Sequence, residues 1–145
     1  MRMFLVLIVM MMSSAFVMAQ DNYGFKVAGV DVTSDNYLDL TEISGVSGKV
    51  YFDPNTRTLT LDNATIEVDG CNAILNKDCR YLVIELLGTN TINVTNSAGI
   101  YTCESTAILG GSGSTLTVKN DRCAVLFEGS PLEIVNCWLE VEGEW

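Results

Sequence analysis

The residues of this chain that could do chemistry are first of all its carboxylates. The chain has 18 Asp and Glu residues and no histidine. Without histidine it lacks the commonest general base, the Ser–His and Cys–His nucleophile pairs and the usual zinc ligand. Hydrolysis of a glycosidic bond needs two carboxylates about 5–10 Å apart. Whether two carboxylates reach that spacing depends on the elements that carry them.

Metal and cofactor chemistry has little support in the sequence. The five cysteines, at positions 71, 79, 103, 123 and 137, form no CxxC pair and show no metal-ligand spacing. Calcium-assisted lyase chemistry would need clustered carboxylates beside an Arg or Lys base, and no acidic cluster stands near Arg57 or Arg80. We therefore expect no metal and no cofactor.

Length and charge limit the function classes further. The 145 residues allow one ordinary domain, and the formal net charge of −10 argues against nucleic acid as a partner, because proteins that bind nucleic acid carry basic patches.

Residues 1–19 predict a cleaved signal peptide. Arg2 supplies positive charge, residues 4–12 form an unbroken apolar run, and Val17 and Ala19 are small residues at the −3 and −1 positions of a cleavage site. The run is too short for the roughly 20 apolar residues that span a bilayer. We expect an exported protein (periplasmic, on the outer-membrane surface or secreted) with no membrane span after signal cleavage.

An internal repeat organises the second half of the chain. Residues 65–68, 91–94, 115–118 and 138–141 alternate between apolar and polar, as strands with one buried face do. Two further series repeat with nearly the same period, at residues 59–61, 82–84, 107–109 and 132–134, and at residues 73–75, 99–101 and 124–126. Three strands every 24–25 residues, joined by turns too short for helices, predict a parallel β-helix.

In a parallel β-helix each strand pairs with its equivalent one coil later, so inward residues form ladders. The predicted ladders are Ile66–Ile92–Leu116–Leu139, Val68–Val94–Val118–Val141 and Ile74–Ile100–Val125. An antiparallel sandwich is the alternative, but it has no reason to repeat a three-strand motif in register.

We expect the β-helix coils at residues 57–145 and N-terminal cap strands at residues 20–56, which lack the period. Solenoids need caps to cover apolar interior and unpaired strand edges. No C-terminal cap is evident. Either the sequence is a piece of a longer solenoid, or Trp138 and Trp145 fold over the open end.

Several of these segments resemble a known family. They are residues 24–30 and 50–54, then Thr58-Leu-Thr-Leu-Asp-Asn-Ala-Thr-Ile66, residues 82–92 and the Gly99-Ile100 step. In these segments the chain is similar to exported bacterial proteins described as carbohydrate-binding-domain-like, right-handed parallel β-helices. The resemblance implies a right-handed parallel β-helix, and the period gives this all-β fold about four coils with three short strands each. The resemblance provides no binding motif that could be assigned to particular residues of this chain.

The repeat also places candidate site residues. Outward positions of the series that begins at residue 65 would make a flat polar sheet, which suits sugar hydroxyls, with an aromatic ring at its end for stacking. The candidate ligand-binding residues there are Thr91, Asn93, Thr115, Thr117, Trp138 and Glu140. Tyr81 and Tyr101 are alternative exposed aromatic residues.

Two further pairings follow from the period. Cys79 and Cys103 are 24 residues apart, one coil, so they could stack within disulfide range. Asp62 and Glu85, 23 residues apart, could be neighbours, but the next coil offers Gly110-Gly111 and no third acid.

The sequence therefore predicts an exported, non-catalytic β-helix module that binds a polysaccharide or another cell-surface partner. One alternative is a polysaccharide-degrading β-helix enzyme or its inactive relative. The other is a structural or adhesin segment of a longer solenoid, capable of end-to-end self-association.

Overall fold

The structure, a computed structural model, describes residues 19–143. The predicted signal peptide, apart from Ala19, and Trp145 lie outside the described residues. No helix in the described part of the chain is long and apolar enough to cross a membrane.

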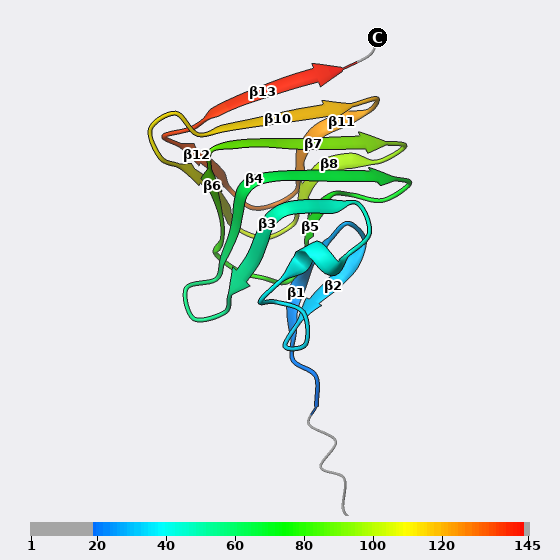
Figure 1. The fold of residues 1–145 in the computed structure, drawn as a ribbon, viewed down its shortest axis with the longest axis vertical. Coiled ribbons are helices and arrows are strands. Elements are labelled where there is room, and N and C mark those ends of the chain that lie inside the picture. The colour runs from blue at the N-terminus through cyan, green and yellow to red at the C-terminus, as the bar shows by residue number, and fades with distance from the viewer. Residues whose placement is uncertain (1–18, 144–145) are drawn as a thin grey trace, which may run out of the picture.

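The described chain is all-β except for one short 3₁₀ helix, and its strands stack in parallel as coils (Figure 1). The N-terminal elements are β1 (Asn22–Val27), β2 (Val30–Thr33), η1 (Leu40–Glu42) and β3 (Val46–Asp53). The stacked strands are β4 (Thr58–Asp69), β5 (Ile74–Asn76), β6 (Leu82–Leu87), β7 (Thr89–Thr95), β8 (Ala98–Thr102), β9 (Thr106–Gly110), β10 (Thr115–Asn120), β11 (Cys123–Phe127), β12 (Leu132–Val135) and β13 (Trp138–Gly143).

These strands make three faces of a solenoid. The first face is β4–β7–β10–β13, the second is β4–β6–β9–β12 and the third is β5–β8–β11, with every neighbouring pair parallel. The predicted parallel β-helix is confirmed. The chain completes about three turns, close to the expected four, and β13 begins the next one.

The long strand β4 takes part in two faces because it bends. Its first part pairs with β6 up to Asp62, and its second part pairs with β7 from Thr65 onward. Between them Asn63 has a φ of 47°, a left-handed conformation that asparagine tolerates better than most residues. One strand therefore starts two faces of the solenoid.

Antiparallel strands cover the N-terminal end of the stack. β3 runs along the whole free edge of β4, from Val46 opposite Ile66 to Asp53 opposite Thr58. β1 covers β5 in the same way. Beneath them the rings of Phe25 and Phe52 pack with their centroids 4.8 Å apart. β3 and β1 thereby pair with backbone N–H and C=O groups of β4 and β5 that would otherwise be free to pair with another chain.

The inward ladders differ in part from the predicted ones. Ile66 and Ile92 do stack, and Ile74–Ile100–Val125 is confirmed. At β10, however, Val118 and not Leu116 lies opposite Ile92, and Val141 follows. The predicted register of β10 and β13 against β7 is thus wrong by two residues.

A buried asparagine, Asn90, lies opposite Leu116, where the predicted register had Ile92. Asn90 lies in the inward line Ala64–Asn90–Leu116–Leu139 and is 1% exposed. Its side-chain oxygen accepts from the backbone N–H of Ala64 (2.9 Å), and its side-chain nitrogen donates to the carbonyls of Leu87 (3.2 Å) and Thr115 (3.3 Å). Asn90 therefore ties its own coil to both neighbours.

The last rung is open to solvent. Val118 is fully buried, whereas Val141, in the same ladder, is 56% exposed, and Phe127, Ile134 and Val135 are exposed too. Trp138 is 71% exposed, so it does not fold over this end.

A matched pair of substitutions measures how much the burial of Val118 stabilises the fold compared with the exposed Val141. Val118→Ala should lower the free energy of unfolding by about 2–3 kcal/mol, because it removes buried methyl groups and leaves a cavity. Val141→Ala should cost about 0.5 kcal/mol or less. Urea denaturation of both variants checks this, and equal costs would show that the last rung is covered in solution.

Candidate functional site: a groove on the first face

The outward side chains of the first face stand in rows that cross its strands. One row is Glu67–Asn93–Lys119–Glu142, and the row beside it is Thr65–Thr91–Thr117–Glu140. Neighbouring members of a row are about 4.8 Å apart, because that is the spacing of hydrogen-bonded strands. The backbone ladder therefore sets the spacing of the rows.

A groove of about 650 Å³ lies where these strands end. It crosses all four strands of the first face. Its lining residues are Glu67, Val68, Asp69, Asn93, Val94, Thr95, Lys119, Asn120, Asp121, Glu142 and Gly143.

Polar contacts between coils order the row in the groove. Asn93 donates from Nδ2 to Oε1 of Glu67 (3.1 Å), and Nζ of Lys119 lies 2.9 Å from Oε2 of Glu142. Oδ1 of Asn93 is buried and has no hydrogen-bond partner. An amide flip would not help it, because the oxygen would then face the Glu67 carboxylate. The groove therefore holds an acceptor without a donor.

The second polar group of the groove is built around Asp69. Its Oδ1 accepts from the Thr95 hydroxyl (2.6 Å) and from Nδ2 of Asn96 (2.8 Å). The backbone N–H of Asn96 in turn donates to Asp121 (2.9 Å). The Thr95 bond, followed by the Asn96 bond, lowers the pKa of Asp69 below its ordinary value. Asp69 is therefore ionised at neutral pH and ready to accept further hydrogen bonds.

These groups suit a ligand that donates hydrogen bonds. The groove has four carboxylates, of Glu67, Asp69, Asp121 and Glu142, and one cation, Lys119, which already pairs with Glu142. Within residues 19–143 no three His, Cys, Asp or Glu side chains are placed to hold a metal ion. Hydroxyl groups of a polyol are donors of the required kind.

Of the six candidate residues from the sequence, only Asn93 lines the groove. All six belong to β7, β10 and β13 of the first face. Thr91, Thr117 and Glu140 stand in the neighbouring row, and Thr115 lies opposite Trp138 and Thr89 in another. The structure thus confirms no single site made of all six.

Sequence reasoning missed Lys119, Glu142, Asp69, Thr95 and Asp121. The register error at β10 placed Thr117 beside Asn93, whereas Lys119 lies there. A signal was available in the chain: Thr89-Asn90-Thr91-Ile92 and Thr115-Leu116-Thr117-Val118 share a Thr-x-Thr-aliphatic pattern, and these segments do pair.

The other predicted pairings fare as follows. All five cysteines are free in the structure. Asn76 pairs with Thr102, so Cys79 lies three residues beyond this pair and Cys103 only one, and the two cysteines are offset where the prediction had them stacked. Glu85 lies opposite Thr60, which donates to it (3.2 Å), while Asp62 lies opposite Leu87. Asp62 and Glu85 are therefore not directly opposite each other.

The two alternative aromatic residues differ in their surroundings. Tyr101 donates its hydroxyl to Glu128 (2.7 Å), a bond that raises the pKa of Tyr101, and its ring is partly buried. Tyr81 is 68% exposed.

No protein-family model matches the chain, and neither the curated proteins nor the solved structures contain a match.

The bond from Thr95 to Asp69 can be tested by titration. Thr95→Val keeps the shape of the side chain but removes its hydroxyl, so the pKa of Asp69 should rise toward its ordinary value. A depressed carboxyl pKa stabilises the fold above the unfolded-state pKa, and this contribution is lost as the pH falls through the folded-state pKa. In the variant this contribution should therefore be smaller, and its loss should be complete at a higher pH, while the loss still begins near the unfolded-state pKa.

Carboxyl-detected NMR titration of both proteins measures the pKa directly. Thr91→Val is the control, because Thr91 is also outward on β7 but makes no side-chain bond to Asp69. An unchanged pKa in Thr95→Val would mean that the hydroxyl does not hold the carboxylate.

Proposed function

We propose that this protein is an exported, non-catalytic carbohydrate-binding module and that the groove on its first face is the binding surface. The observation that carries the proposal is the row Glu67–Asn93–Lys119–Glu142, which crosses four parallel strands inside a groove of about 650 Å³. A row of polar groups repeated once per coil suits a chain of repeating units, such as a polysaccharide.

The donors and acceptors of the groove support this ligand class. The unpartnered Oδ1 of Asn93 and the ionised Asp69 both call for donors, which sugar hydroxyls supply. Burying a polar atom without a partner is costly, so a ligand that satisfies it gains affinity. The resemblance to exported carbohydrate-binding-domain-like proteins points the same way, as does the predicted signal peptide.

Binding fits the groove better than hydrolysis does. Asn96 donates hydrogen bonds to both Asp69 and Asp121. These two carboxylates are therefore the candidate hydrolytic pair of the groove. A hydrolytic pair needs one carboxyl that stays protonated near neutral pH, which requires a raised pKa. The pKa of Asp69 is lowered, so Asp69 does not supply the proton of such a pair. Release of reducing ends from a polysaccharide by the purified protein would favour the alternative, a polysaccharide-degrading enzyme.

A screen of the purified protein on a glycan array tests the proposal, followed by titration of the best ligand against variants. Asn93→Ala and Lys119→Ala should each weaken binding about fivefold or more, since a lost hydrogen bond contributes about 1 kcal/mol. Thr91→Ala is the matched control on the same strand as Asn93 but outside the groove.

Two outcomes would contradict the proposal in different ways. If no glycan is retained, carbohydrate binding itself is wrong. If Thr91→Ala, Thr117→Ala or Trp138→Ala weakens binding and Asn93→Ala does not, the neighbouring rows form the binding surface.

End-to-end self-association, the structural alternative, has the exposed last rung in its favour. In a two-fold, antiparallel pairing of β13 with its copy that places Glu140 opposite Glu142, however, carboxylates would face each other. Sedimentation velocity of the purified protein distinguishes a monomer from such an assembly.

A further inference from the structure

Tyr81 has an unusual backbone for an aromatic residue. It lies in the corner just before β6, with a φ of 59°. Left-handed φ values suit glycine and asparagine, because a larger side chain crowds the backbone there. The ring is nevertheless 68% exposed, so burial of the ring does not compensate for the strained corner.

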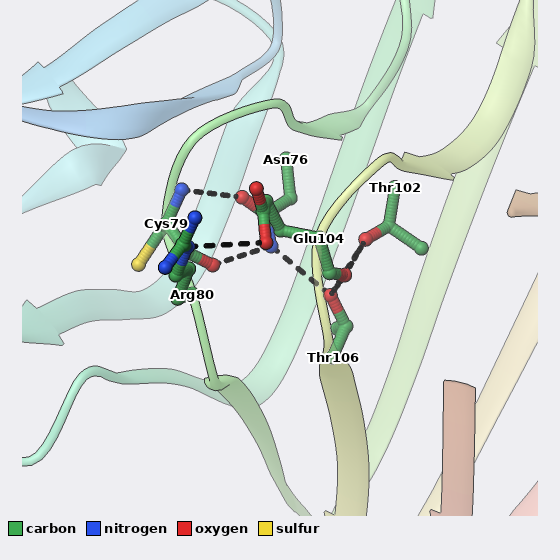
Figure 2. Close-up of polar contacts among 6 residues, drawn as sticks. All are labelled: Asn76, Cys79, Arg80, Thr102, Glu104 and Thr106. Carbon is green, nitrogen blue, oxygen red and sulfur yellow. Dashed lines mark hydrogen bonds and ion pairs between the residues drawn. The ribbon is translucent and has the colours of Figure 1, made fainter. Parts of the chain in front are cut away.

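A buried hydrogen-bond network holds this corner in place (Figure 2). Asn76, 1% exposed, accepts from the backbone N–H of Cys79 (3.0 Å) and donates from Nδ2 to the Cys79 carbonyl (2.9 Å) and to the Thr106 hydroxyl (3.0 Å). Nε of Arg80 lies 3.8 Å from Oε2 of Glu104. Through Asn76, Cys79 is linked to Thr106 of the next coil, and a strained conformation persists where its surroundings determine it in this way.

The same network shapes a small pocket beside Tyr81. The pocket has a volume of about 220 Å³ and lies on the second face, where β6, β9 and β12 begin. Its lining residues are Tyr81, Leu82, Val83, Ser105, Thr106, Ala107, Pro131 and Glu133. Thr106 belongs to both the network and the pocket, so the network fixes one wall of the pocket as well as the corner that carries Tyr81.

The register explains the shape of this pocket. Val83, Ala107 and Glu133 stand in one outward row across the three strands. Ala107, the smallest of the three, leaves a depression between the other two. Tyr81 stands on the β6 side and Glu133 on the β12 side. They are two strand spacings, or about 10 Å, apart across the strands and two residues, or about 7 Å, apart along them.

We propose that this pocket binds a cation on an apolar stem, such as the side chain of a Lys or Arg residue or an alkylammonium ion. The stem lies on Val83, Ala107 and Pro131. The head lies between the face of the Tyr81 ring and the Glu133 carboxylate, within the roughly 6 Å of a cation–π contact and the reach of an ion pair. At about 220 Å³ the pocket is smaller than the roughly 300–1,000 Å³ of sites for whole organic ligands, so it takes one side chain.

Charge supports this occupant. Glu133 is exposed and has no ion pair with a residue of the described chain. The formal net charge of −10 attracts cations to the whole surface. The pocket lies on a different face from the groove, and its occupancy does not depend on glycan binding.

NMR titration of the purified protein with Nα-acetyl-lysine amide and Nα-acetyl-arginine amide tests the proposal. Both should shift the methyl signals of Val83 and Ala107 in a saturable way. Nα-acetyl-norleucine amide, which keeps an apolar stem without the charge, should bind at least tenfold more weakly. n-Butylammonium distinguishes the two sources, because it binds as well as the lysine amide if the site takes small amines and more weakly if it takes a residue of a polypeptide.

Two variants separate binding from stability. Tyr81→Asn should raise the Tm by about 3–5 °C, because asparagine tolerates the corner, and should abolish the methyl shifts. Arg57→Asn is the matched control: Arg57 is the left-handed residue just before β4, with a φ of 55°, and lies outside the pocket. It should raise the Tm in the same way without changing binding. Glu133→Gln, at an exposed position, should weaken cation binding at least fivefold.

The proposal is wrong if the cationic probes leave the Val83 and Ala107 methyls unshifted, or if the norleucine probe binds as tightly as the lysine probe. It is also wrong if Tyr81→Asn binds the cation as well as the unmodified protein does. None of these results bears on the groove, whose glycan binding is measured separately.

Discussion

The structure depends on the parallel pairing of each strand with its equivalent one coil later. This pairing satisfies the backbone hydrogen bonds and sets the distance between coils at about 4.8 Å. It brings side chains of one type into line, so that Ile66, Ile92 and Val118 stack inside while Glu67, Asn93 and Lys119 stand in a row outside. The groove therefore follows from the ladder. The backbone pairing of the strands sets the spacing of the polar row Glu67–Asn93–Lys119.

The parallel ladders of the first and second faces both begin at strand β4. Because β4 bends at Asn63, one strand opens two faces, and β3 covers its whole outer edge. Gly48 of β3 lies opposite the bend, where a Cβ atom would come within 2.4 Å of the Asn63 carbonyl oxygen. The close approach of the two backbones at this point requires glycine.

The fold could be predicted from the sequence, but the composition of the site could not. A slip of one residue would turn every apolar side chain outward, so the alternating pattern identifies the inward face of each strand with little ambiguity. A slip of two residues keeps every side chain on its face. Leu116 and Val118 are both inward and both buried, and either could have stacked on Ile92. The two registers differ in which inward residues stack and in their polar contacts, and the register decides whether Thr117 or Lys119 stands beside Asn93.

Two residues with unusual local structure each line a cavity. Asn93 buries an oxygen without a partner, although Asn76 and Asn90 have partners for both of their polar atoms. Tyr81 places an aromatic ring at a left-handed corner, whereas Asn63, Asn96 and Asn136 are asparagine and Arg57 carries a flexible side chain at theirs. In a repeat structure each coil shows what its neighbours could have adopted, so a departure at one coil is informative. Proteins tolerate such departures chiefly at functional sites, and here one lies in the groove of the first face and the other beside the pocket of the second.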